Sequence, residues 1–149
     1  MTTFATLADV QAVGLPASSL GTLTLAQQQA CVDWANADAG ARLAGRYPGI
    51  NEGGAGWSWD YSVTGYTVAL ARKRMLDVRG RAPSTASADK LIDDLYAEAI
   101  AWFEGVQKQA IHPYITGGEL PGATSQGPVL TSSSTLWTNS GYRASNRGL

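Results

Sequence analysis

The sequence has very few of the side chains on which most catalytic and metal-binding sites are built. Its 149 residues include one cysteine, Cys31, and one histidine, His112. A single cysteine excludes a disulfide within the chain and a metal cage built from cysteines, so we expect Cys31 to be a small buried residue. His112 precedes Pro113 at an expected helix end, which is typical of a cap rather than of a catalytic base. The sequence therefore predicts no enzyme, no cofactor and no metal site.

An excess of one charge and long apolar runs are missing too. The formal net charge at pH 7 is -1, so no overall field favours nucleic acid or an anionic membrane. No stretch approaches the roughly 18 apolar residues that suggest a membrane-spanning helix. The first ten residues, MTTFATLADV, lack the basic region and apolar run of a secretory signal. We expect a soluble protein without a membrane partner, made in the cytoplasm or assembled there.

Two further patterns resemble functional motifs but have simpler explanations. The glycine-rich residues 53–56 lack the lysine and the hydroxyl residue of a phosphate-binding loop, and they follow a helix rather than a strand. Asp93, Asp94 and Glu98 lie on one expected helix without a matching histidine or glutamate motif elsewhere. The first pattern indicates a loop, and the second indicates a solvated helix face.

Apolar spacing and cap signals predict a small all-α bundle. Thr6 and Asp9 form a capping box for a short helix over about 7–13, and Thr24 caps a helix over about 25–46. Two more helices are expected over about 59–79 and 88–110. The three main helices carry apolar stripes with steps of three or four, namely Ala30, Trp34, Ala37, Ala41 and Ala44; Trp59, Val63, Tyr66 and Leu70; and Leu91, Leu95, Ala99, Trp102 and Val106.

The helix expected over 25–46 is unusually thin at its end, where alanine and glycine fill most of positions 37–45. Small side chains allow another helix to approach closely, so we place this helix in the middle of the bundle, with aromatic residues of its neighbours filling the space. Arg46, Tyr47 and Pro48 then end the helix at the edge of the bundle, where Tyr47 covers the core.

Basic residues concentrate near the end of the helix expected over 59–79. Five of the eleven lie within ten positions: Arg72, Lys73, Arg74, Arg79 and Arg81. Successive helical residues point in different directions, so these side chains do not form one tight patch. We favour ion pairs with the acidic helix over 88–110. The alternative is contact with nucleic acid, although no helix-turn-helix or zinc-finger pattern accompanies the cluster.

The composition changes after residue 111. Residues 112–149 have three charged side chains and no helical periodicity, which predicts an extended, mostly irregular arm beside a helical domain over 1–111. Its composition leaves two interpretations open, namely a solvated, flexible tail or an arm whose sparse large apolar residues dock on a partner. The expected contacts with that partner are Leu130, Leu136, Trp137, Tyr142, Arg143 and Arg147.

Four segments, taken in order, resemble a family of phage proteins. They are TFATLADVQA at the start, ADAGARLAGRYP, VTGYTVALARKRM and LYAEAIAWFEGV. Together they are similar to the small helical head–tail connector proteins of Mu-like phages, which include adaptor and head-completion proteins. The matching positions, spread over about residues 4–108, are Ala5, Thr6 and Asp9; Ala37, Ala41, Arg46, Tyr47 and Pro48; Val68, Ala69, Ala71 and Arg72; and Tyr96, Ala99, Trp102 and Phe103.

This chain departs from the family pattern in two places. Pro48 follows Tyr47 directly instead of after a gap, and residues 49–58 are rich in glycine where relatives often have a proline-led segment. The C-terminal segment matches only loosely. The resemblance is therefore carried by the order and spacing of the four segments, and no single motif defines it.

The resemblance implies a structural virion protein in the phage neck, assembled in the host cytoplasm. Such proteins form a homo-oligomeric ring, commonly a dodecamer, that joins the portal protein to neck or tail-completion proteins and continues the channel for genomic DNA. The arm over 112–149 would pack on the portal, with the six residues named above as its contacts. The basic residues within 72–81 would face the DNA channel or a neighbouring subunit.

One other function stays open from the sequence. A small helical protein that binds or packages DNA would use residues 72–81 directly. Steeply salt-dependent binding of free DNA would favour that function, whereas copurification with a portal protein would favour the connector.

Overall fold

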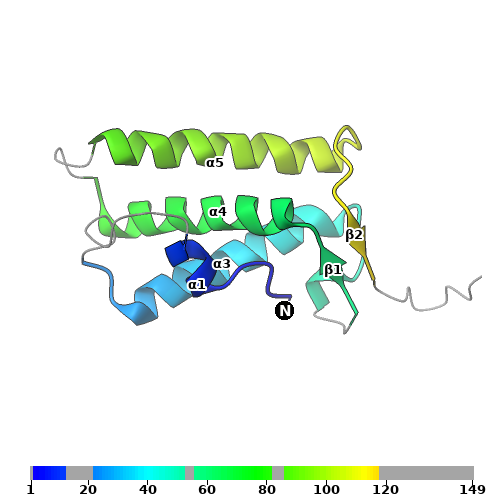
Figure 1. Cartoon of the computed structure of the whole chain (residues 1–149), viewed down its shortest axis with the longest axis horizontal. Coiled ribbons are helices and arrows are strands. Elements are labelled where there is room, and N and C mark those ends of the chain that lie inside the picture. Colours follow the sequence, from blue (N-terminus) through cyan, green and yellow to red (C-terminus); the bar gives the residue numbers. More distant parts are fainter. Residues whose placement is uncertain (1, 13–21, 53–55, 82–85, 118–149) are drawn as a thin grey trace, which may run out of the picture.

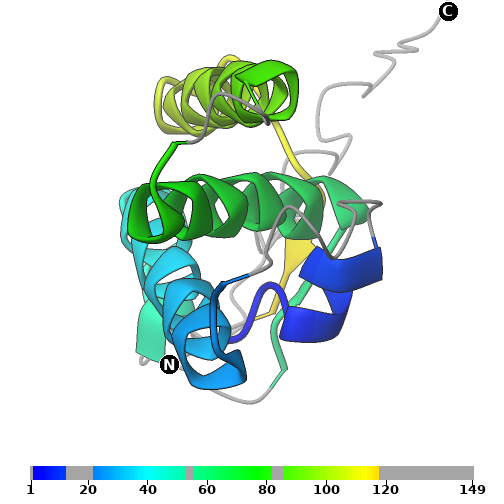
Figure 2. The same cartoon turned by 90° about the vertical axis from the view of Figure 1, so that its left-hand side faces the viewer.

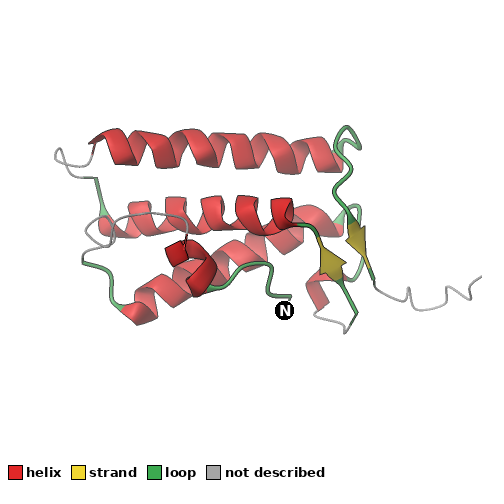
Figure 3. Cartoon of the chain, in the orientation of Figure 1, coloured by secondary structure: helices red, strands yellow, loops and turns green. Residues whose placement is uncertain are grey.

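Helices dominate the structure, a computed structural model that describes residues 2–12, 22–52, 56–81 and 86–117. Figure 3 shows them in red beside a single small pair of strands. The all-α prediction is confirmed for the described residues. In chain order the elements are α1 (Leu7–Ala12), α3 (Leu25–Ala44), the 3-10 helix η1 (Ile50–Glu52), β1 (Ser58–Trp59), α4 (Tyr61–Arg79), α5 (Ala86–Gln107) and β2 (Ile115–Thr116).

Helix α4 lies at the centre of the arrangement, so the prediction that placed the helix over 25–46 in the middle of the bundle is wrong. In Figure 1, α5 runs antiparallel along one side of α4, and α3 crosses α4 on the other side. The end view in Figure 2 places α1 beside α4, and Gln11 of α1 also donates to the side chain of Gln28 on α3 at 3.4 Å. Strands β1 and β2 pair antiparallel at the end of the bundle where α4 begins and α5 ends. Short elements, α1 and the β1–β2 pair, thus lie at the edges of the helical body near its first and last residues.

The central position of α4 explains its composition. Residues 67–72 are all buried, which leaves no polar face along nearly two turns of the helix. The hydroxyl of Thr67 donates to the carbonyl of Val63 at 2.8 Å, and the buried guanidinium of Arg72 donates to the carbonyl of Val10 at 3.2 Å. Of the stripe predicted for this helix, Val63 and Leu70 are buried, while Trp59 and Tyr66 pack against the core.

Helix α3 begins as predicted but buries a different face. The capping box between Thr24 and Gln27 is present, which confirms Thr24 as the N-cap. The predicted stripe was the wrong face, since Ala30, Trp34, Ala37 and Ala41 are exposed. The buried side chains are Gln28, Cys31, Val32, Ala35, Asn36, Ala39 and Leu43, together with Gly40. Both faces have helical spacing. The face that is buried carries Val32, Leu43 and the amide of Asn36.

The thin helix packs closely against the N-terminal segment. Asn36 Oδ1 accepts from the backbone N–H groups of Phe4 at 2.8 Å and Ala5 at 3.0 Å, and its Nδ2 donates to the Ala5 carbonyl at 2.9 Å. A Cβ at Gly40 would overlap the side chain of Asn51 and crowd Phe4. The small residues therefore make room for extended chain as well as for a helix. The capping box of Thr6 and Asp9 at the start of α1 is also confirmed.

Helix α5 largely confirms its predicted stripe. Ala99, Trp102 and Val106 are buried and Leu95 packs against the core, but Leu91 is 57% exposed and the neighbouring Ile92 takes its place inside. The helix ends at Gln107, before the expected position 110. The end is a Schellman motif, in which Gln109 adopts a φ of 59° and Ala110 N–H donates to the Gly105 carbonyl at 2.9 Å.

The difference between buried and exposed aromatic residues can be measured by mutation. Phe103 is fully buried, whereas Trp34 is 40% exposed. We expect Phe103→Ala to lower the free energy of unfolding by about 3–5 kcal/mol, and Trp34→Ala to cost clearly less. Urea denaturation followed by circular dichroism checks both variants. Equal losses at the two sites would contradict the face assigned to α3.

Candidate interaction surfaces

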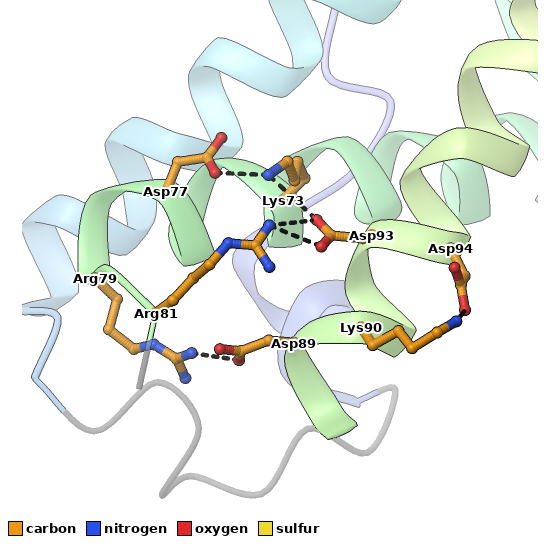
Figure 4. Close-up of polar contacts among 8 residues, drawn as sticks. All are labelled: Lys73, Asp77, Arg79, Arg81, Asp89, Lys90, Asp93 and Asp94. Atoms are coloured by element: carbon orange, nitrogen blue, oxygen red, sulfur yellow. Dashed lines mark hydrogen bonds and ion pairs between the residues drawn. The ribbon is translucent and has the colours of Figure 1, made fainter. Parts of the chain in front are cut away.

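The basic residues near the end of α4 form ion pairs with the first turns of α5, as Figure 4 shows. Lys73 Nζ lies 2.7 Å from Asp77 Oδ1 and 3.3 Å from Asp93 Oδ1, and Arg81 Nη2 lies 2.7 Å from Asp93 Oδ2. The hydrogen bond from Arg81, with support from Lys73, holds the pKa of Asp93 below its usual range. These contacts confirm the predicted pairing with the acidic helix for Lys73 and Arg81.

A second pair in the same region is far less exposed to solvent. Arg79 Nη2 contacts Asp89 Oδ1, and the two side chains are 11% and 3% exposed. The neighbouring pair of Lys90 and Asp94, 2.7 Å apart on α5, is open to water. Because a charge removed from water needs its partner, the buried pair contributes more to the position of α5 than the exposed pair does.

Removing one member of the buried pair is expected to destabilise the fold. We expect Arg79→Gln to lower the free energy of unfolding by about 3 kcal/mol, since the buried Asp89 carboxylate loses the guanidinium. Lys90→Gln is the matched control, with no measurable loss expected at its exposed pair. Thermal melts at low and moderate salt check both variants. A loss at Lys90 as large as that at Arg79 would contradict the assignment.

The remaining basic residues of the cluster lie in different environments. Arg72 is 5% exposed, and burial lowers its pKa, so it belongs to the interior, where its side chain also lines a groove between α4 and α5. Arg74 is exposed, and its guanidinium lies 5.2 Å from the ring centroid of Trp34. The structure thus spreads the five predicted residues over the interior, an internal ionic network and one surface position.

Arg46 holds the end of α5 and the segment after it. Its Nη1 donates to the carbonyls of Val106 at 3.1 Å and Ile111 at 2.8 Å, and its Nη2 contacts Nδ1 of His112. A cation beside terminal carbonyls is favoured by the helix dipole. Tyr47 packs against the core, as the sequence predicted. The sequence predicted for Arg46 only a position at the end of its own helix, because its partners lie 60 to 66 positions away.

Asp60 provides the second attachment of the same segment. Its carboxylate accepts from the backbone N–H of Ser62 at 3.0 Å, as the N-cap of α4, and from that of Tyr114 at 2.9 Å. Beside it, Ser58 pairs with Thr116 and Trp59 with Ile115 across β1 and β2. We call Arg46, Asp60 and the β1–β2 pair the C-terminal anchor.

The C-terminal anchor fixes residues 112–117 against the helical body. The division into a domain over 1–111 and an arm over 112–149 stays a prediction, with the first six residues of the arm packed on the bundle. The predicted contact residues of the arm lie outside the described residues: Leu130, Leu136, Trp137, Tyr142, Arg143 and Arg147.

The stability that the C-terminal anchor contributes should depend on pH through Asp60. Burial by itself raises the pKa of Asp60, but hydrogen bonds from Ser62, Tyr114 and Val63 outweigh burial and lower the pKa. A lowered pKa contributes stability above the unfolded-state value of about 3.9, and this contribution is lost as pH falls through the folded-state pKa. We therefore expect the melting temperature of the wild type to exceed that of Asp60→Asn near neutral pH, and the gap to narrow below about pH 4. Melts across this range check it, and a constant gap would contradict it.

An apolar groove of about 290 Å³ lies between α4 and α5. Its walls include Tyr61, Tyr66, Val68, Ala69, Leu95 and Glu98, and Arg72 also lines it. The hydroxyl of Tyr66 donates to Glu98 Oε1 at 3.3 Å, and burial together with this carboxylate raises the pKa of Tyr66. The groove can accept an apolar or aromatic side chain, with one carboxylate at its rim.

Comparison with known proteins gives no match, so the role of these surfaces is inferred from their own residues. No protein-family model, curated protein or solved structure matches the chain. Among residues 2–12, 22–52, 56–81 and 86–117, no cluster of three or more His, Cys, Asp or Glu side chains is placed to hold a metal ion. None of the helices that the structure describes is long and apolar enough to span a membrane.

Proposed function

We propose that the chain is a structural virion protein, a head–tail connector subunit that joins the phage portal to neck or tail-completion proteins. The segments that resemble the family support this, because several of their residues hold the helices together in the fold, although Ala37 and Ala41 are exposed. Asp9 caps α1, Arg72 links α4 to the end of α1, and Arg46 holds the end of α5. Trp102 and Phe103 lie in the core. The motifs thus mark one coherent helical body.

The observation that carries the proposal is the C-terminal anchor. Arg46, Asp60 and the β1–β2 pair hold the chain through residue 117 at one end of the bundle. Residues 118–149 therefore begin from a fixed point on the body, at the end where α4 starts. A fixed origin favours docking, because it keeps the arm near one end of the body and raises its effective concentration at a partner that binds there. In the proposed neck complex, the arm contacts the portal, and copies of the body surround the DNA.

The ionic network makes the DNA-binding alternative less attractive. Lys73, Arg79 and Arg81 already pair with carboxylates of the same chain, so phosphate groups would have to compete with those contacts. Passage of genomic DNA through a ring needs no sequence-specific contact, and a subunit of net charge -1 suits it better than a strongly basic one would.

The proposal is tested by truncation after Gly117, which keeps the whole C-terminal anchor. We expect the truncated chain to retain its helical circular dichroism and its melting temperature, because every described contact remains. It should fail to attach to portal-bearing heads in a pull-down or complementation assay. The full chain with Arg143→Gln and Arg147→Gln is the intermediate case, with weakened attachment expected if these arginines pair with acidic portal residues.

Two outcomes would overturn the proposal. Attachment of the truncated chain at full strength would remove the arm from the portal contact. Tight and steeply salt-dependent binding of free DNA by the full chain, weakened by Arg74→Gln, would favour the alternative of a DNA-binding or packaging protein.

A further inference from the structure

One face of α3 is apolar, and its side chains are exposed among the residues that the structure describes. It carries Ala30, Trp34, Ala37 and Ala41, and the guanidinium of Arg74 from α4 lies over the Trp34 ring. We call these five residues the Trp34 face. Tryptophan and arginine are the residue types most enriched at binding hot spots, and the small residues beside them allow a partner to approach closely. The spacing that made this face look like core in the sequence is the spacing of a face built for burial.

The groove between α4 and α5 lies on the opposite side of α4. Gly65 lines the groove and precedes Arg74 by nine residues, which is two and a half turns of an α-helix, so the two positions point in opposite directions. At the rim of the groove, the side chain of Tyr61 is 75% exposed and Glu98 is open to water. The Trp34 face and the groove are therefore two separate surfaces of one subunit.

The two surfaces complement each other in shape and charge. The Trp34 face projects an aromatic ring, and the groove is an apolar hollow with aromatic walls. Among the residues that the structure describes, Arg74 has no carboxylate partner and Glu98 has no cationic partner. Arg74 and Glu98 thus place opposite charges at the two surfaces, and the buried Arg72 in the groove lining already donates to the Val10 carbonyl.

We infer that copies of this chain associate head to tail, with Trp34 of one copy in the α4–α5 groove of the next and Arg74 beside Glu98 of that copy. Contacts between two different surfaces are heterologous, and they build a ring if the rotation between copies closes. The inference deepens the proposed function, on which the closure into a ring rests, by naming the faces through which subunits meet. The contact itself depends only on these side chains.

Charge reversal tests the pairing of Arg74 with Glu98. The full chain, Arg74→Glu, Glu98→Arg and the double variant are purified, and their self-association is measured by sedimentation velocity over a concentration series. The wild type should associate, and each single variant should associate about tenfold more weakly or worse. An equal mixture of the two single variants should recover association, because the Arg74→Glu copy keeps an intact groove and the Glu98→Arg copy keeps an intact Trp34 face. The double variant should recover as well.

Two further variants separate the contact from the fold. Trp34→Ala should abolish association while the circular dichroism spectrum stays helical, because Trp34 lies outside the buried face of α3. Lys108→Glu is the matched control, since it makes the same charge change at an exposed pair with Glu104, at the C-terminal end of α5 and outside the groove lining. It should associate like the wild type.

The results are decisive in either direction. A wild-type chain that stays monomeric at every concentration, or single variants that fail to recover on mixing, would overturn the inference. If copies associate as described but do not attach to portal-bearing heads, the proposed function fails and this contact stands. If the chain attaches to heads and charge reversal changes nothing, the contact fails and the proposed function stands.

Discussion

The enclosure of α4 is the constraint on which the rest of the structure depends. Six consecutive residues, 67–72, are buried, so each neighbouring element has to satisfy a different side of one helix. A buried guanidinium is costly without hydrogen-bond acceptors, and Arg72 finds one in the Val10 carbonyl at the end of α1. The short N-terminal helix is thereby tied to the centre of the bundle, while α3 and α5 cover the sides that α1 leaves.

The charges follow from the same arrangement. Where α4 leaves the core, its cations meet the acidic first turns of α5, and Lys73, Arg79 and Arg81 pair with Asp93 and Asp89. At least three of the five cations in a segment that looks basic in the sequence are therefore paired with carboxylates in the fold. Among the described residues, the surface also carries apolar patches beside its polar side chains: the Trp34 face, the groove between α4 and α5, and the tyrosines near the C-terminal anchor. Such a distribution is more typical of a subunit that binds other proteins than of one that binds nucleic acid.

The proposed contacts use different parts of the molecule. The C-terminal anchor lies at the end of the bundle, where β1 and β2 pair, and the Trp34 face lies along the side of α3. A connector subunit has to engage a neighbouring copy and a partner ring at the same time, so contacts with separate origins do not compete. The groove begins at Tyr61, one residue after Asp60, which brings the copy-to-copy contact close to the origin of the arm.

The sequence by itself determined the parts of this protein that depend on near neighbours. The capping boxes of Thr6 and Thr24, the existence of the helices and the pairing of the basic cluster with the acidic helix all follow from spacings of a few residues or one short connection. Only the tertiary structure decided which face of α3 is buried, because two faces have the same period and the choice depends on Phe4 and Ala5 meeting Asn36. It also decided the role of Arg46, whose acceptors at Val106 and Ile111 are distant in sequence and come within hydrogen-bonding range only when α3 and α5 have packed against α4.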